Sequence, residues 1–576
     1  MNGRKVIVLG GGVAGMSAAH ELVERGFEVH VYELKSIPGG KARSIPVPNS
    51  GKDGRSDLPG EHGFRFFPRF YRHVTDTMKR IPYGNNKNGV FDNLVQTTRI
   101  LVTQDYKPGV TMLSRFPRSA HDWEVALDEV RATETDIGLK PGELTFFAER
   151  IWQIMTSSEA RREDEYERIG WWTFIGADTR SPGYQKFLAA GLTRSLVAAK
   201  ARLASARLEG DIGLQLFLDL GEPGISADRV LDGPTNDVWL HPWLEYLRAR
   251  GVQYHLEHRL NFLNCVDGRI QNVEVVGPEG PVTVSGDYYV VAVPLEVIGR
   301  ILAEERHKPI LQADPGLEGI LTFRQYVAWM NGLQLYIKRD IPIVNGHAIY
   351  VDSPWAITSI SQKQFWPNTD LSQYGDGTVQ GIISVDISDW QTPGSNGKTA
   401  DECTPEEIKD EVLHQIMESL NIDGKVILSK DDVIDWFLDP DIRPRLRKDL
   451  DLYNDAEPLM VAEVNTWHLR PDAHTRIPNL FLAADYIRTN TQLATMEAAN
   501  EAARRAVNAI IIASGADAPL CKIWKLQEPG IMAIWRWYDR RRYDRGEPWS
   551  SGFPWFVEIM QRILIWVVQL SRKLRS

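Results

Sequence analysis

Cysteine is scarce in this chain of 576 residues, which has only Cys265, Cys403 and Cys521. The three lie far apart, show no metal-ligand spacing and cannot all pair, which fits a reducing compartment rather than a disulfide scaffold. Motifs of metal-dependent or nucleophilic hydrolysis are also missing, since the chain has no HExxH, no CxxC and no Ser–His–Asp order. The sequence therefore predicts neither a metal site nor a hydrolase.

Long hydrophobic runs and an excess of basic residues are missing as well. No stretch of 18 clean apolar residues occurs, so we expect no transmembrane span. A β-strand pattern begins at about Lys5, so we expect no signal peptide and a cytoplasmic protein. The net charge of −10 argues against nucleic-acid binding. The length predicts two or three domains.

The first thirty residues carry the most specific motif. "KVIVLGGGVAGMSAAHELVERGFEVHVYE" has the pattern strand, tight turn, helix, strand, with Gly10-x-Gly12-x-x-Gly15 directly after the first strand. Gly10 permits the tight turn, Gly12 lets the backbone approach a diphosphate, and Gly15 lets the helix pack close to the strand. The helix N-terminus offers unpaired N–H groups to phosphates. This pattern predicts a dinucleotide-binding fold.

An acid and a second glycine turn follow this unit. Glu33 ends the second strand, where it can accept hydrogen bonds from ribose hydroxyls. "LKSIPGGKARS" then puts Gly39-Gly40 and Arg43 back toward the diphosphate. This continuation resembles that of the flavin amine oxidase and phytoene desaturase superfamily, and the resemblance implies FAD rather than NAD. The predicted FAD-binding residues of this region are Gly10, Gly12, Val13, Ala14, Gly15, Glu33, Leu34, Gly39, Gly40, Lys41, Ala42 and Arg43.

A second nucleotide-facing unit lies near the other end of the chain. "IPNLFLAADYIRTNTQLATMEAANEAARRAVNAII" (477–511) has the pattern of a buried strand over 480–483, followed by Asp485 and by a helix over 494–511. Asp485 can bind the ribityl chain or bridge to phosphate. The strand and the helix would therefore bring this acid to the same nucleotide as the N-terminal glycines.

The helix of this second unit is predicted to face the flavin. Backbone N–H groups near Thr495, Met496 and Glu497 can face the flavin edge on which negative charge develops during reduction. "ADYI…TMEAA…EA" is similar to the "GDYT…SMEGA…SG" pattern of plant- and cyanobacterial-type carotenoid desaturases, with Ala484 and Ala498 in place of two glycines. Among the families of the superfamily, these desaturases are the nearest resemblance.

A third piece, 251–297, is rich in alternating β-formers. It resembles the middle segment of the superfamily's flavin domain. The resemblance implies that Leu260 holds adenine through its backbone and that "VVAVP" (290–294), with Ala292, runs under the nucleotide.

The stretch "PGEHGFRFFPRFYRHV" (59–74) is similar to "ETGLHIFFGAYPN" of the plant-type desaturases. In the superfamily this segment passes near the isoalloxazine ring, so Gly63, Phe64 and Arg65 are predicted to bind FAD. His62 and Arg65, the latter standing where that family has histidine, are the predicted catalytic residues. The alternative is an aromatic-rich loop that packs the domain interface, with its basic side chains paired to acids.

Together these segments predict an α/β fold, with a Rossmann-type FAD-binding domain built from three discontinuous pieces and an interleaved α+β substrate domain. The insertion after the first piece is mostly helical in pattern, whereas 322–390 alternates as strands. Thr404 and Glu407 form a capping box for a surface helix. The predicted boundaries are 1–77, 235–300 and 455–515 for the FAD-binding domain, 78–234 and 301–454 for the substrate-binding domain, and 519–576 for a C-terminal helical tail.

The resemblance implies hydride transfer from an sp³ carbon to flavin N5. The expected substrate is long and lipophilic, isoprenoid or carotenoid-like, the product has a new or shifted double bond, and a quinone or O₂ reoxidises the flavin. An amine oxidase, a redox-neutral isomerase or dehydroxylase, and a non-catalytic prenyl-lipid carrier stay open. Amine oxidases usually have a lysine where the alignment puts Asn331 or Gly332. A carrier has no reason to keep Glu33, Arg43 and Asp485.

The last part of the chain differs in charge from the rest. From Pro519 onward eleven Lys/Arg face five Asp/Glu, an excess of six positive charges in an acidic protein, together with six tryptophans. "GFPWFVEIMQRILIWVVQLSRKLRS" (552–576) places apolar residues at helical spacing and basic residues at its end. This composition suits an interfacial helix on anionic lipid and predicts peripheral membrane association. The alternative is a helix docked on the protein's own core or on another subunit.

Overall fold

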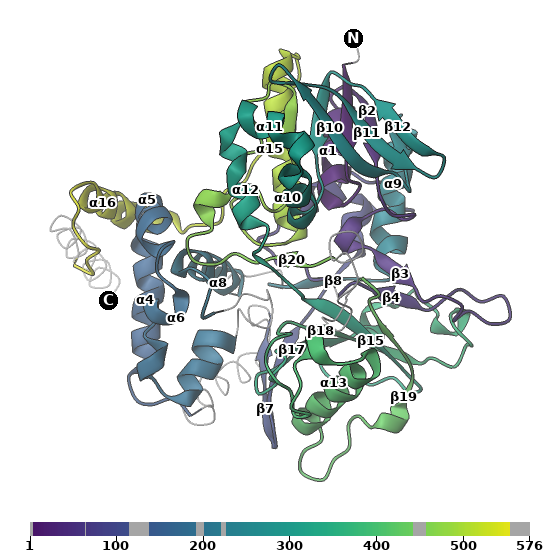
Figure 1. The fold of residues 1–576 in the computed structure, drawn as a ribbon. Coiled ribbons are helices and arrows are strands. Elements are labelled where there is room, and N and C mark those ends of the chain that lie inside the picture. Colours follow the sequence, from purple (N-terminus) through teal and green to yellow (C-terminus); the bar gives the residue numbers. More distant parts are fainter. Residues whose placement is uncertain are drawn as a thin grey trace, which may run out of the picture.

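The computed structural model describes residues 4–63, 65–114, 138–191, 201–220, 226–441 and 457–552. Phe64 and nearly all of the predicted interfacial helix over 552–576 lie outside the described residues. The described chain contains a five-stranded sheet, a seven-stranded sheet and a layer of helices, arranged as Figure 1 shows.

A parallel five-stranded sheet lies in the largest hydrophobic core. Its order is β21-β13-β1-β2-β9, and each neighbouring pair is parallel. Strands β1, β13 and β21 are short apolar runs, as expected when both faces of a sheet are buried, whereas β2 and β9 at one side of the sheet alternate polar and apolar residues. Their bounds are Lys5–Leu9 (β1), Glu28–Tyr32 (β2), Gln253–His255 (β9), Tyr288–Val291 (β13) and Leu480–Leu482 (β21). The sheet therefore joins three widely separated stretches of the chain.

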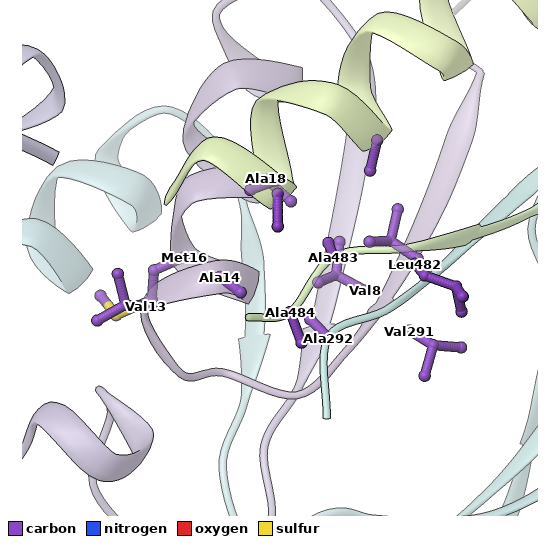
Figure 2. Close-up of a cluster of buried hydrophobic side chains, with 14 of the residues drawn as sticks. Val8, Val13, Ala14, Met16, Ala18, Val291, Ala292, Leu482, Ala483 and Ala484 are labelled. Atoms are coloured by element: carbon purple, nitrogen blue, oxygen red, sulfur yellow. The ribbon is translucent and has the colours of Figure 1, made fainter. Parts of the chain in front are cut away.

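Two long helices pack against each other beside this sheet. Helix α1 (Val13–Val23) follows β1 directly, and α15 (Met496–Ser514) follows β21 after a loop. Figure 2 shows the buried side chains where these helices meet the strand ends, among them Ala14, Ala18 and Ala484. Because both helices begin near the carboxyl ends of the strands, both N-termini point toward the same edge of the sheet.

Smaller elements complete this part of the molecule. An antiparallel sheet consists of β10 (Arg259–Val266), β11 (Arg269–Gly277) and β12 (Gly280–Val284), and a hairpin consists of β3 (Ser44–Pro46) and β4 (Pro59–Glu61). The accompanying helices are α2 (His73–Met78), α9 (His241–Ala249), α10 (Leu295–Ala303), α11 (Lys308–Ala313) and α12 (Glu318–Phe323).

The seven-stranded sheet has a separate core, which α13 (Pro405–Leu420) covers. The capping box that the sequence predicted for α13 is confirmed, because the Thr404 side chain accepts from the Glu407 N–H and the Glu407 carboxylate accepts from the Thr404 N–H at 2.8 Å. The strands in sheet order are β19 (Val433–Leu438), β15 (Asn331–Ile337), β18 (Gly381–Ile387), β17 (Ile357–Ser361), β16 (Gly346–Tyr350), β6 (Arg99–Gln104) and β7 (Lys107–Leu113). Two short pairs are β5 (Leu94–Gln96) with β8 (Arg229–Leu231) and β14 (Val327–Ala328) with β20 (Leu459–Met460).

The prediction that the first insertion is mostly helical is wrong for the stretch over 94–113, which forms β5, β6 and β7. Strand β6 pairs in parallel with β16, so that Ile100 lies opposite His347. This partner lies more than two hundred residues further along the chain, and local periodicity therefore gives no sign of it. The domain boundaries themselves stay a prediction.

A layer of helices lies on the other side of the molecule, at the left of Figure 1. Its own core includes Trp171 and Trp172, which are both buried. The segment 516–530 leads from α15 to this layer, and Asp539 of α16 pairs there with Arg161 at 2.9 Å. The helices are α4 (Glu143–Thr156), α5 (Glu159–Arg161), α6 (Trp171–Phe174), α8 (Ala206–Leu220) and α16 (Ala533–Asp544). Within the ranges that the structure describes, every helix is too short or too polar to cross a bilayer.

Candidate active site

A cavity of about 310 Å³ lies at the carboxyl edge of the parallel sheet. Residues that follow four of its strands line the cavity: Gly10 after β1, Glu33 after β2, Ala292 after β13 and Asp485 after β21. Ligands of open α/β sheets bind at this edge. The predicted site residues that line the cavity are Gly10, Gly12, Val13, Ala14, Glu33, Leu34, Gly39, Gly40, Lys41, Ala42, His62, Gly63, Arg65, Leu260, Ala292, Asp485, Thr495 and Met496.

The turn between β1 and α1 leaves no room for side chains. Gly10 has φ of +107°, and a Cβ at Gly15 would lie 1.8 Å from the Gly10 carbonyl oxygen. Gly15 therefore serves the close contact between helix and turn and does not itself line the cavity. Gly12 is the N-cap of α1, and no side chain caps this helix or places an acid in its first turn. The first N–H groups of α1 are thus left for an anionic ligand.

The second glycine turn lies directly against the first. The Gly39 N–H donates to the Gly11 carbonyl at 3.0 Å, and a Cβ at Gly40 would lie 2.9 Å from the Gly12 Cα. Both Gly39 and Gly40 have positive φ, so non-glycine residues would be strained at both positions. This turn brings Lys41 and Ala42 to the cavity wall.

Glu33 is buried and holds the backbone of both neighbouring loops. Its carboxylate accepts from the Gly11 N–H at 2.5 Å and from the Lys35 N–H at 2.8 Å. Burial raises its pKa, and these two hydrogen bonds oppose the shift. Glu33 therefore fixes the turn geometry and at the same time lines the cavity, in the position where a ribose hydroxyl would meet it.

Arg43 lies outside the cavity lining. Its guanidinium donates to the Gly40 carbonyl and to the Glu457 carboxylate, each at 2.7 Å, and it also pairs with Asp441. Lys35 joins the same group through Asp441 at 3.0 Å. Arg43 thus ties the glycine turn to carboxylates that lie four hundred residues away in the sequence. Its predicted contact with the diphosphate stays a prediction.

The C-terminal unit reaches the cavity through Asp485 and the start of α15. Burial raises the pKa of Asp485, although Lys41 and Arg470 act against this. The Thr495 hydroxyl caps α15 by accepting from the Ala498 N–H at 3.2 Å. Glu497 turns its carboxylate away from its own helix end to accept from the backbone N–H groups of residues 72–74.

Charged side chains meet at another part of the cavity wall. Arg65 is half-buried and donates to the carbonyl oxygens of Lys41 and Ala42, each at 3.1 Å. Burial lowers the pKa of Arg65, while Glu61 and Asp386 oppose this. Burial raises the pKa of Glu61 to about 7. His62 contacts Asp439. The arrangement therefore combines both interpretations of this stretch, since basic side chains are paired with acids and also line the cavity.

Several residues of the wall were not predicted. They include Met330 before β15, Asp386 in β18, Glu296 in α10 and Glu457. Lys41 pairs with Glu296 at 3.0 Å. None of these residues belongs to a local motif. Asp386 could have been found only from the pairing of its strand, β18, with β15.

The strand that was aligned with the amine oxidase lysine has no space for such a side chain at Gly332. A Cβ there would lie 2.8 Å from the Gly63 Cα, and the Gly332 N–H donates to the His62 carbonyl at 3.0 Å. The two lysines of the cavity wall, Lys35 and Lys41, are both paired with carboxylates.

Comparison with known proteins identifies the family. The family model described as flavin containing amine oxidoreductase matches residues 13–511. The chain belongs to this family. It is therefore an FAD-dependent oxidoreductase, and the resemblance that the glycine motifs and the C-terminal unit indicated is confirmed.

Carotenoid enzymes are among its curated relatives. Zeta-carotene desaturase of Synechocystis sp. is 23% identical over 308 residues, which are 52% of this chain and 59% of the relative. Probable zeta-carotene desaturase of Synechococcus elongatus is 24% identical over 322 residues, or 53% of this chain and 61% of the relative. Carotenoid phi-ring synthase of Chlorobaculum tepidum is 41% identical over 69 residues, or 12% of this chain and 10% of the relative. The chain thus matches from a tenth to about three fifths of these relatives' own length.

Solved structures share the fold. Wild-type putrescine oxidase is 13% identical, with a TM-score of 0.58 over 88% of this chain and 99% of that chain. An oxidoreductase from Methanosarcina mazei is 14% identical, with a TM-score of 0.55 over 88% of this chain and 100% of that chain. The mixed α/β fold of this flavoenzyme group is therefore present.

The residues of the cavity fit FAD. The N-terminus of α1, which no side chain caps, suits the diphosphate. Next to it, Gly12 and Gly40 lie against each other and bring no side chain into this space. Glu33 suits the adenosine ribose at one end of the cofactor, and Asp485 suits the flavin half. In the part of the chain that the structure describes, no cluster of His, Cys, Asp or Glu side chains is arranged to hold a metal.

Proposed function

We propose that this enzyme removes hydrogen from a long lipophilic, isoprenoid or carotenoid-like substrate and thereby forms or moves a carbon–carbon double bond. The observation that carries the proposal is the similarity to two zeta-carotene desaturases over more than half of this chain. Bound FAD would supply the acceptor for a hydride and return to its oxidised form with a quinone or O₂. The protein would bind the chain of the substrate and exclude water.

The proposed FAD contacts follow from the site. The backbone N–H groups at Val13 and Ala14 would bind the diphosphate, and Glu33 would bind the ribose. The N-terminus of α15, at Thr495 and Met496, would face the flavin. Gly63 would allow the backbone of its loop to approach the ring system.

Apolar side chains of the cavity wall would contact the substrate. Phe66, Met330 and Leu459 belong to different segments that meet at the cavity. His62 and Arg65 would lie near the reacting carbons. Apolar side chains beside placed polar groups are typical of sites that orient a lipophilic molecule.

Amine oxidation is the second candidate, because the family's description names it and because putrescine oxidase shares the fold. The crowded position of Gly332 argues against it.

Reduction of the flavin separates the two candidates. Purified holoenzyme is mixed anaerobically either with vesicles that carry phytoene or zeta-carotene or with a panel of primary amines. Bleaching of the flavin absorbance by a polyene supports the proposal, whereas bleaching by amines alone overturns it.

We further propose that the substrate is taken from a membrane surface. Helix α16 exposes Ile534 (37%) and Trp537 (47%), and Ile531 (72%) is exposed in the turn before it. The Arg541 guanidinium lies 4.1 Å from the Trp537 ring centroid. The opposite face is held to the protein through Asp539. Exposed apolar and aromatic side chains beside arginine are typical of interfacial helices on anionic lipid.

Flotation with phosphatidylcholine vesicles, with and without phosphatidylglycerol, tests this proposal on the full chain. Replacing Ile531, Ile534 and Trp537 by serine is expected to lower the affinity for anionic vesicles at least about tenfold. Each substitution removes apolar area that would be buried in the lipid interface. The matched control is Ile512→Ser in α15, which is 71% exposed on another element. Unchanged flotation of both the triple variant and a chain without 553–576 would overturn the proposal.

A further inference from the structure

A buried histidine–aspartate pair forms part of the cavity wall. Nδ1 of His62 contacts one carboxylate oxygen of Asp439, and these side chains are 4% and 0% exposed. The other carboxylate oxygen of Asp439 accepts from the Asp441 N–H at 2.8 Å. Burial raises the pKa of Asp439, but the contact with His62, the hydrogen bond from the Asp441 N–H and the positive charge of Arg43 together hold it below its usual value. The aspartate is therefore an ionised, fixed partner for one side of the imidazole.

The second ring nitrogen of His62 is free. Nε2 is buried and has no hydrogen-bond partner among the described residues, and His62 lines the cavity. His73 shows the contrast, because its Nδ1 contacts Glu497 at 2.7 Å and its Nε2 accepts from the Trp524 N–H at 2.9 Å. A buried nitrogen without a partner costs stability unless a ligand engages it, and the Nε2 of His62 belongs to a residue that lines the cavity. The open nitrogen of His62 is therefore available to a ligand in the cavity.

Neighbouring charged groups are already engaged. Glu33 accepts from two backbone N–H groups, and Glu457 pairs with Arg43 at 2.7 Å. Arg65 has no lone pair to offer at neutral pH and donates to backbone carbonyls. These groups set the local field around His62, and its Nε2 is a basic atom of the wall that no described group engages.

We propose that His62 is the proton acceptor of the reaction and that Asp439 is its positioning residue; this rests on the proposed function. Asp439 would keep the ring proton on Nδ1, so that Nε2 presents a lone pair to the substrate. In a desaturation, C–H bonds on two adjacent carbons break and a C=C bond forms. One hydrogen leaves with its bonding electrons to FAD, the two-electron oxidant, and the other leaves as a proton to Nε2. The carboxylate of Asp439 balances the charge that the imidazole gains.

The position of the ring proton tests the pair without any substrate. Holoenzyme labelled with ¹⁵N-histidine is studied by NMR in mildly alkaline buffer, and His62→Gln assigns the His62 signals. We expect the proton on Nδ1 and none on Nε2 in the unmodified enzyme. We expect Asp439→Asn to reverse this preference, because an amide N–H can donate to Nδ1. A proton on Nε2 of the unmodified enzyme, or an unchanged tautomer in Asp439→Asn, overturns the proposal.

Flavin reduction by the polyene vesicles gives the kinetic test. Asp439→Asn and His62→Gln are each expected to slow anaerobic reduction about 100-fold, with FAD content and reoxidation by O₂ unchanged. The double variant should be no slower than His62→Gln, since the two act as one unit, and Asp439→Glu should recover part of the rate. Multiplying effects in the double variant would overturn the proposal.

The matched control for these rates is His20→Gln, a fully buried histidine that pairs with Glu24 at 3.0 Å beyond the cavity. Its rate of flavin reduction should stay within about twofold of the unmodified enzyme. If no polyene reduces the unmodified enzyme, the proposed substrate class fails. The tautomer measurement still decides the role of the pair.

Discussion

The cavity wall is built in two different ways. The glycine region, which comprises Gly10, Gly12, Gly39 and Gly40, presents backbone to the cavity and leaves no room for a Cβ at Gly10, Gly39 and Gly40. The charged region comprises His62, Arg65 and Asp386 in the wall and Glu61 and Asp439 behind it, and these buried or half-buried side chains interact with one another or with backbone carbonyls. The shape of the backbone determines the structure of the first region, and charge pairing between distant residues determines that of the second. Substitutions in the two regions should therefore have different effects on the protein.

The largest effect is expected in the glycine region for Gly15→Ala. The new Cβ would lie 1.8 Å from the Gly10 carbonyl oxygen, which forces α1 away from the turn that holds the diphosphate. We expect purified protein without flavin absorbance and a loss of about 3 kcal/mol in the free energy of unfolding. Gly213→Ala in α8 is the control, because nothing lies within 4 Å of its Cβ. A yellow, stable Gly15→Ala protein would contradict the close packing of this turn.

Arg43→Met should separate stability from cofactor binding. Removing the guanidinium leaves the carboxylates of Asp441 and Glu457 with Lys35 in place of two cations, which costs about 3 kcal/mol in the free energy of unfolding of the apoprotein. FAD affinity, measured by titration of the apoprotein, should change by less than about threefold.

The control for Arg43→Met adds Glu457→Gln, which should restore most of the lost stability because Lys35 then remains paired with Asp441. A large loss of FAD affinity in Arg43→Met, with unchanged apoprotein stability, would instead place Arg43 at the diphosphate.

Glu61→Gln should change how stability depends on pH. Burial raises the pKa of Glu61 from 4.5 to about 7, so folding favours its protonated form. Its contribution is fully present below pH 4.5 and is lost as pH rises through about 7, by about 3 kcal/mol in total. Urea unfolding across this range should show the unmodified enzyme losing stability relative to Glu61→Gln and then running parallel to it above pH 7. A constant difference between the two proteins would mean that Glu61 is ionised throughout.

The glycine region could be predicted from the sequence because its physics is local. Gly10, Gly12 and Gly15 follow one strand and precede one helix, and Gly39-Gly40 follow the next strand, so spacing alone predicts the turns. The second unit, with Asp485 and the start of α15, was found for the same reason.

The charged region could not be predicted in this way. Asp439 follows β19 and Asp386 lies in β18, and only the pairing of β15 with both strands brings these acids to His62 and Arg65. Strand β6 was not predicted for the same reason, because its partner β16 lies far along the chain. The resemblance of this stretch to the desaturases therefore pointed to the histidine and the arginine but not to the acids beside them.

The smallest effect is expected for substitutions of Thr495. They test how the N-terminus of α15 differs from that of α1 at the cavity. Helix α15 is capped by the Thr495 hydroxyl, whereas α1 has no side-chain cap. Thr495→Ala should therefore lower the free energy of unfolding of the apoprotein by about 1 kcal/mol, and Thr495→Ser should retain it. FAD affinity should hardly change in either variant, because the Thr495 hydroxyl is already engaged by an N–H group of its own helix. Weaker FAD binding with an equally stable apoprotein would show that the hydroxyl serves the cofactor, and α15 would then resemble α1 more closely than its cap suggests.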